Sequence, residues 1–127
     1  MRRILVATDR SASADRAVRW AAEMAERYEA ELLVLQVVAE GSAAALPALA
    51  EFASSVASPA RARVETDEDP SAAIVRVAGE EAVDVLVVGN VGMSGRREFL
   101  LGNVPNRVSH NAPCTVVIVD TSSERRR

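Results

Sequence analysis

The chain has 127 residues, the size of a single domain, and 49% of them are hydrophobic, so a packed core is expected and wholesale disorder is not. The net charge of −3 argues against a nucleic-acid-binding protein that works through a broad basic face, and no apolar stretch approaches the roughly 20 residues of a membrane span. The apolar run after Met1 is too short for the core of a signal peptide, so a cytoplasmic location is expected.

Apolar runs rich in β-branched residues alternate with segments of helical periodicity. Continuous runs are typical of strands that are covered on both faces, and the 3.6-residue period is typical of helices that pack on them. In chain order, the pattern predicts a strand at 4–7, a helix at 13–28, a strand at 32–38, a weak helix between mobile loops within 41–60, an edge strand at 62–66, a helix at 70–82, a strand at 85–88, a helix at 104–110 and a strand at 116–119. One domain is expected over residues 1–121, followed by a flexible C-terminal tail at 122–127.

The helix predicted at 13–28 has an apolar stripe that begins at Ala14 and ends at Tyr28, with Asp15 lying off the stripe. Ser11 and Ser13 precede or open this segment, and both are candidates for its N-cap.

This alternation predicts an α/β fold with a single doubly wound, five-stranded parallel sheet and right-handed crossovers. For the strand order 3-2-1-4-5, the winding direction reverses between the first and fourth strands. Ligands bind beyond the carboxyl ends of the strands at such a point. Residues 8–13 and 89–103 are therefore the candidate binding segments.

The composition restricts how a phosphate could be held. All 15 basic residues are arginine, so lysine-dependent sites such as the Walker A loop are excluded. The single cysteine, Cys114, excludes an internal disulfide and a cysteine-rich zinc site. The groups that could still hold a phosphate are backbone N–H groups, hydroxyls, side-chain amides and arginine.

A glycine-rich segment follows the fourth predicted strand. Gly89, Gly92 and Gly95 fall within seven residues, and Gly102 precedes the next predicted helix. Glycines let the backbone approach an anion closely, and a helix N-terminus supplies partial positive charge, so a phosphate cradle is one interpretation. A strand-to-helix turn that needs glycine for its own backbone is the other.

The spacing Gly89-x2-Gly92-x9-Gly102 resembles the nucleotide-binding signature G-x2-G-x9-G-[S/T] of the universal stress protein family. The resemblance extends over nearly the whole chain, because the opening strand with its Asp9-Arg10-Ser11 turn, the fourth strand and the entry to the last strand also look like those of the family. It implies a Rossmann-like fold of the adenine nucleotide alpha hydrolase type and a stress-response protein that binds ATP or AMP.

The resemblance also implies a binding site, position by position. Asp9 would accept hydrogen bonds from ribose hydroxyls, although a loop or capping role is the other interpretation of this residue. The remaining positions would surround adenosine and phosphate: Ala7, Thr8, Val37, Val88, Gly89, Gly92, Gly102, Asn103, Val104 and Pro105. Asn103 stands where the family signature has Ser or Thr, and Pro105 lacks an N–H near the phosphates. Because of these two departures, AMP and cyclic AMP are candidate ligands as well as ATP.

No catalytic residue is assigned, since no general base, metal cluster or activated nucleophile is visible. A regulatory nucleotide-binding protein is the leading hypothesis. A slow ATPase using Mg²⁺ carried in by the nucleotide, a cyclic-AMP-binding protein and a pure interaction module are the alternatives. Arg96 and Arg97 could meet either phosphate or solvent.

The last predicted strand contains neither a charged residue nor proline from Thr115 to Val119. An apolar strand at the edge of a sheet invites pairing with the same strand of a second copy. The sequence therefore predicts a homodimer through this strand.

Overall fold

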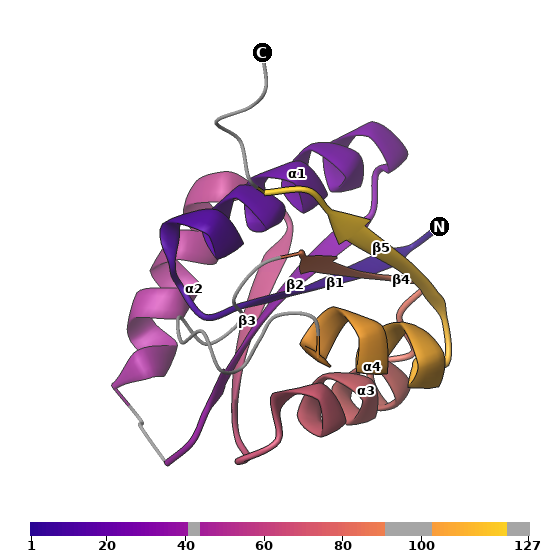
Figure 1. Cartoon of the computed structure of the whole chain (residues 1–127). Helices are drawn as coiled ribbons and strands as arrows, with labels where there is room; N and C mark the ends of the chain where they lie inside the picture. Colours follow the sequence, from indigo (N-terminus) through magenta and orange to yellow (C-terminus); the bar gives the residue numbers. More distant parts are fainter. Residues whose placement is uncertain (41–43, 91–102, 122–127) are drawn as a thin grey trace.

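The computed structural model describes residues 1–40, 44–90 and 103–121, and its strands and helices alternate along the chain (Figure 1). The elements are β1 (Arg3–Thr8), α1 (Ala12–Tyr28), β2 (Glu31–Val38), α2 (Ala45–Val56), β3 (Ala60–Thr66), α3 (Pro70–Glu80), β4 (Val85–Gly89), α4 (Asn103–Asn111) and β5 (Thr115–Val119). No helix in the described part of the chain combines the length and apolarity of a membrane span.

The five strands form one parallel sheet in the order β3-β2-β1-β4-β5, which confirms the predicted fold class and strand order. Helices α1 and α2 cover one face of the sheet, and α3 and α4 cover the other (Figure 1). Because side chains alternate along a strand, Ile4 and Val6 of β1 point to the α1 face, whereas Leu5 and Ala7 point to the α3 face. Both faces of β1, β2 and β4 are buried, as their continuous apolar runs predicted, whereas the equally apolar run of β5 lies at the edge of the sheet and leaves Ile118 46% exposed.

Alanines on α1 bring the helix close to the sheet. Ala17, Ala21 and Ala25 are at most 3% exposed and pack against the branched side chains of β1 and β2. Ser11 is the N-cap, and its hydroxyl accepts a hydrogen bond from the N–H of Ala14 at 3.2 Å. The predicted helix and one of its two candidate caps are therefore confirmed.

Two residues of α1 contradict the predicted stripe. Tyr28 is 57% exposed, because the α1 residues that contact the sheet end at Ala25. Asp15 is only 9% exposed, because its carboxylate lies against the β1–α1 turn and pairs with Arg10 there. The helical period alone does not reveal this pairing.

The remaining elements match their predicted positions to within a few residues. The segment at 41–60 contains α2, in which Leu49 and Ala53 are the buried residues. Strand β3 begins two residues before its predicted start, and α3 opens with Pro70 after an Asp69 N-cap. The predicted tail at 122–127 lies outside the described residues.

Candidate functional site

The candidate site lies at the carboxyl ends of β1 and β4, the two strands between which the winding direction reverses. Strand β1 pairs with β2 on one side and with β4 on the other. The chain leaves β1 for α1 on one face of the sheet, and α4, which follows β4, packs on the opposite face. The turn after Thr8 and the end of β4 at Gly89 therefore meet at the switch point of the sheet.

The turn between β1 and α1 is held by a closed set of hydrogen bonds. The Thr8 hydroxyl accepts from the N–H of Arg10 at 2.9 Å and donates to Oδ1 of Asp15 at 3.3 Å. Since Thr8 is 1% exposed and its hydroxyl is engaged within the protein, this side chain supports the turn. A contact from Thr8 to a ligand would have to come from its backbone.

Asp9 has one engaged and one unengaged carboxylate oxygen. Its Oδ1 accepts a hydrogen bond from the N–H of Ser11, the N-cap of α1, at 2.9 Å, so Asp9 holds the loop before the helix, which is the loop role that the sequence left open. Its Oδ2 is buried and has no hydrogen-bond partner among the described residues. A buried polar atom without a partner costs about 1–3 kcal/mol, and more if it is charged. The unengaged oxygen thus provides an acceptor for a donor from outside the chain.

Apolar side chains gather beside this turn on the face covered by α3 and α4. Ala7 of β1, Val37 of β2, Val88 of β4 and Val104 of α4 belong to, or pack against, the same cluster. Val37 is half-buried, whereas the other three are at most 4% exposed. The structure thus brings together four residues that the family resemblance assigned to the nucleotide site.

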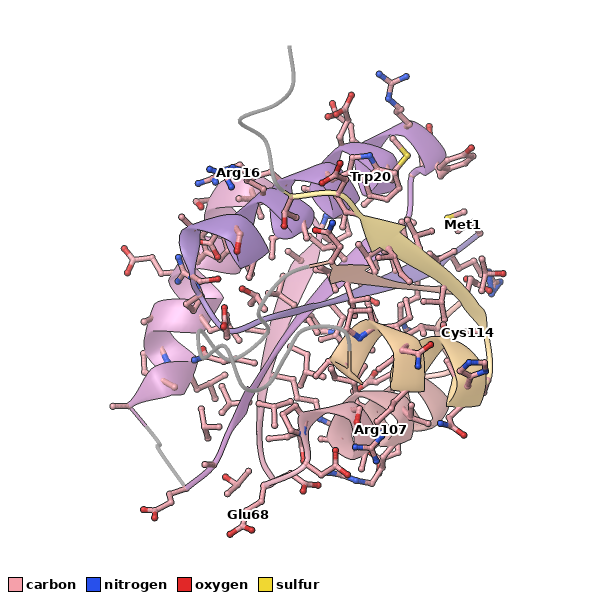
Figure 2. The ribbon with its side chains drawn as sticks, in the orientation of Figure 1. Met1, Arg16, Trp20, Glu68, Arg107 and Cys114 are labelled. Carbon is pink, nitrogen blue, oxygen red and sulfur yellow. The ribbon has the colours of Figure 1, made fainter. Side chains whose placement is uncertain are left out.

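Helix α4 is anchored to α3 through a charged contact. Arg107 of α4 donates to the carboxylate of Asp69, the N-cap of α3, at 3.1 Å, and Figure 2 shows Arg107 lying beside α3. Burial raises the pKa of Asp69, but hydrogen bonds from Ser71 and from the N–H of Ala72, together with the charge and hydrogen bond of Arg107, outweigh that effect, so the pKa lies below its ordinary value. The contact helps to hold α4, whose first turn contains the buried residues Val104 and Pro105.

Gly89 has a packing role that the sequence did not reveal. A Cβ atom at this position would lie 3.3 Å from Cγ2 of Thr121 and 3.8 Å from Cβ of Ala17. Thr121 is 1% exposed, and its N–H and hydroxyl donate to Oδ1 of Asn90 at 3.0 and 3.1 Å. Arg16, labelled in Figure 2, donates to the carbonyl oxygen of Thr121 at 2.9 Å. No sequence pattern pointed to these contacts, which join residues more than 30 positions apart or on different elements.

Gly89→Ala is expected to lower the free energy of unfolding by about 1 kcal/mol, since the new methyl group crowds a packed core. Thr121→Ser removes the crowding Cγ2 and keeps the hydroxyl that donates to Asn90. The double variant should therefore recover most of the loss in chemical denaturation. Equal losses from Gly89→Ala in both backgrounds would contradict this packing role.

Other predicted site residues lie outside what the structure describes. Gly92, Gly102, Arg96 and Arg97 fall within residues 91–102, and Asn103 is described only by its backbone, as the first residue of α4. Within the described ranges, no group of three or more His, Cys, Asp or Glu side chains could hold a metal ion.

Comparisons with known proteins agree on one family. The family model described as "Universal stress protein family" matches residues 1–120. A universal stress protein of Methanothermobacter thermautotrophicus is 48% identical over 58 residues, and one of Mycobacterium tuberculosis is 51% identical over 53 residues. These segments cover 46% and 42% of this chain, and they span only 39% and 36% of the two relatives.

A solved structure is similar over nearly the whole chain. A universal stress protein crystallised in complex with cAMP superimposes with a TM-score of 0.79 at 34% sequence identity, covering 95% of this chain and 98% of that one. The five-stranded order and the motifs of the β1–α1 turn agree with the family model that matches residues 1–120. The chain therefore belongs to the universal stress protein family.

Proposed function

We propose that this protein binds an adenine nucleotide at the carboxyl ends of β1 and β4, in a regulatory role. The observation that carries the proposal is Oδ2 of Asp9, a buried carboxylate oxygen with no partner in the described part of the chain. A ribose hydroxyl is a neutral donor of the right kind for this oxygen, and the hydrogen bond would be charge-assisted. The neighbouring apolar side chains of Ala7, Val37 and Val88 suit one face of a purine base.

The phosphates would extend toward the start of α4. Backbone N–H groups at a helix N-terminus bind anions favourably. They matter here because the chain has no lysine that could bind the phosphates. In this proposal Gly89, Gly92, Gly102, Asn103, Val104 and Pro105 surround the ribose and phosphates. ATP and AMP are the first candidates, and a Mg²⁺ ion would enter only as a companion of the nucleotide.

Cyclic AMP is a second candidate ligand. It is favoured by the relative that was crystallised with cAMP, because that protein is 34% identical and is covered almost completely by this chain. A competition experiment with AMP, ATP and cyclic AMP would distinguish the candidates.

The proposal is tested by calorimetric titration of the purified protein with AMP, ATP and cyclic AMP, after any retained ligand has been removed and identified. The chain has one Trp and one Tyr, so a retained adenine would visibly raise the ratio of absorbance at 260 nm to that at 280 nm. Saturable binding of at least one of these nucleotides is expected. No retained adenine and no binding of any of the three would refute the proposed function.

We also propose a homodimer through β5. In the observed sheet β5 is an edge strand without charged residues, and Ile118 is 46% exposed. Val117 and Val119 instead pack on the α1 face, where Trp20 also lies (Figure 2). Ile118 is thus the apolar side chain of β5 that is available to a second copy.

Ile118→Arg is expected to convert the dimer to a folded monomer, because it places charge on the edge strand without entering the core. Light scattering at micromolar concentration, combined with circular dichroism, measures both properties. Thr66→Arg, on the opposite edge strand β3, is the matched control and should leave the dimer intact. A monomeric wild-type protein would refute this interface.

A further inference from the structure

Arg10 occupies a backbone conformation that is unfavourable for its residue type. Its φ is 69°, in the left-handed region that glycine adopts without steric cost. Glu29, the C-cap of α1, and Ala82 also have positive φ in the described part of the chain. Arg10 differs from both because it directly follows Asp9 in the turn of the candidate site. A strained residue persists where the surrounding structure holds it in place.

The side chain of Arg10 is held on two sides. Its Nε donates to Oδ1 of Asp15 at 3.1 Å, and its Nη2 donates to Oδ2 of the same carboxylate at 2.9 Å. Its guanidinium carbon lies 3.8 Å from the centre of the Phe52 ring. A bidentate arginine–carboxylate pair combined with stacking on an aromatic ring fixes the orientation of a guanidinium more strictly than a single contact does. Arg10 therefore ties the β1–α1 turn to α1 through Asp15 and to α2 through Phe52.

The same residue links the hydrogen bonds around Asp9. The N–H of Arg10 donates to the Thr8 hydroxyl, and the next N–H, that of Ser11, donates to Oδ1 of Asp9. The direction of the Ser11 N–H depends on the left-handed φ of Arg10, since that residue sets the path of the chain between them. The orientation of the Asp9 carboxylate, and hence the position of its unengaged Oδ2, depends on the conformation of Arg10.

We propose that Arg10 is a positioning residue for Asp9: its side chain, clamped between Asp15 and Phe52, holds the turn so that Oδ2 of Asp9 faces the ribose hydroxyls. This inference rests on the proposed nucleotide binding. It predicts that Arg10 sets the preference for a ribose with free hydroxyls, although Arg10 itself need not touch the nucleotide.

The test compares AMP with 2′,3′-dideoxy-AMP, which lacks both ribose hydroxyls. Wild-type protein should bind AMP about tenfold or more tightly than the dideoxy compound. Arg10→Gly keeps a residue that tolerates the left-handed backbone but removes the clamp, so the preference should fall to about threefold or less, mainly through weaker binding of AMP. Arg10→Lys keeps the charge without the bidentate fork and should give an intermediate preference. Glu29→Gly removes left-handed strain far from the turn and should leave the preference unchanged.

A second measurement needs no ligand. In Arg10→Gly the Ser11 amide should exchange its hydrogen about tenfold faster or more, as followed by NMR, because its bond to Asp9 loosens. The amide of Asp69, which donates to Asp67 at 2.9 Å in a similar turn, serves as the internal reference and should not change. Phe52→Leu removes the stacking but leaves Asp15 paired with Arg10. If Arg10→Gly does not fold, this variant is used instead to measure the preference for AMP and the exchange of the Ser11 amide.

The outcomes separate the two proposals. Folded Arg10 or Phe52 variants with the wild-type preference for AMP and the wild-type exchange of Ser11 would overturn the positioning role while nucleotide binding stands. A proportional loss of affinity for both compounds would assign Arg10 a merely structural role. Wild-type protein that binds AMP and the dideoxy compound equally would overturn the ribose contact of Asp9, and the inference with it.

Discussion

Replacing Asp9 with asparagine is expected to weaken the binding of AMP by about 10- to 100-fold and to leave the fold intact. Hydrogen bonds to a charged group contribute about 1.5–3 kcal/mol, and the substitution removes that charge. Because the Ser11 N–H is a donor, it would bind the amide oxygen of the new side chain, which would therefore lie where Oδ1 lies in the wild-type protein. Its NH₂ group would then replace Oδ2 and present a donor where the ribose needs an acceptor.

Asp67 provides a matched control for this experiment. It follows the carboxyl end of β3, and its Oδ1 accepts from the N–H two residues later at 2.9 Å, as Asp9 does in its own turn. Asp67→Asn therefore tests the loss of a turn carboxylate away from the candidate site. Calorimetric titration should show unchanged affinity for AMP, and thermal unfolding should show similar small effects for both variants. Equal affinities of the two variants for AMP would refute the assignment of Asp9.

Lowering the pH from 6 to 3 is expected to remove about 2–3 kcal/mol of stability through the ion pairs beside β3. Arg63 donates to Glu65 at 2.7 Å, to Glu80 at 2.6 Å and to Glu81 at 2.9 Å. Glu81 also accepts from Arg61 at 2.8 Å. Arg61 in turn donates to Glu31 of β2 at 2.7 Å, so the pairs form a network from β2 to α3.

The sign of this pH dependence follows from the carboxyl groups. Hydrogen bonds from Arg61 lower the pKa of Glu31 and of Glu81, and a hydrogen bond from Arg63 lowers the pKa of Glu65. Because the folded pKa lies below the ordinary value of 4.5, the stabilisation is fully present above that value and is lost as the pH falls through the folded pKa. Urea denaturation at a series of pH values measures it.

Arg63→Met separates the network from the general effect of acid. It should cost about 1–2 kcal/mol at pH 7, since it leaves three carboxylates without this partner, and it should flatten the loss of stability below pH 5. Arg27→Met removes an exposed pair with Glu23, whose side chains are 65% and 55% exposed, and should cost less than about 0.5 kcal/mol. Equal costs for the two variants at pH 7 would show that the network adds nothing.

The architecture of this protein was predictable from local patterns. The buried strands read as continuous apolar runs, Pro70 marked the start of α3 and Ser11 capped α1. Each of these signals depends on the side chain and its near neighbours in the chain. Alternation and handedness restrict a parallel sheet of five strands to few arrangements, and the structure confirms the one that was assumed among them.

The switch-point location was predictable in the same way, because topology alone places the ends of β1 and β4 together. The glycine signature and the Asp9-Arg10-Ser11 turn indicated the family, which the comparisons confirm. The roles of the individual site residues stay predictions, and Gly92 and Gly102 lie outside the described residues.

Only the tertiary structure decided how the polar groups around the site are paired. Asp15 has the spacing of a solvent-facing helix residue, yet it is buried because Arg10 and Thr8 surround its carboxylate. Gly89 has the sequence context of a ligand-binding glycine, yet a side chain there would also crowd Thr121. Hydrogen bonds and packing of this kind depend on distances in space between separate elements, to which periodicity and spacing along the chain are insensitive. The unengaged oxygen of Asp9 depends on which partners the neighbouring polar groups of the described residues take up, and spacing along the chain does not show this.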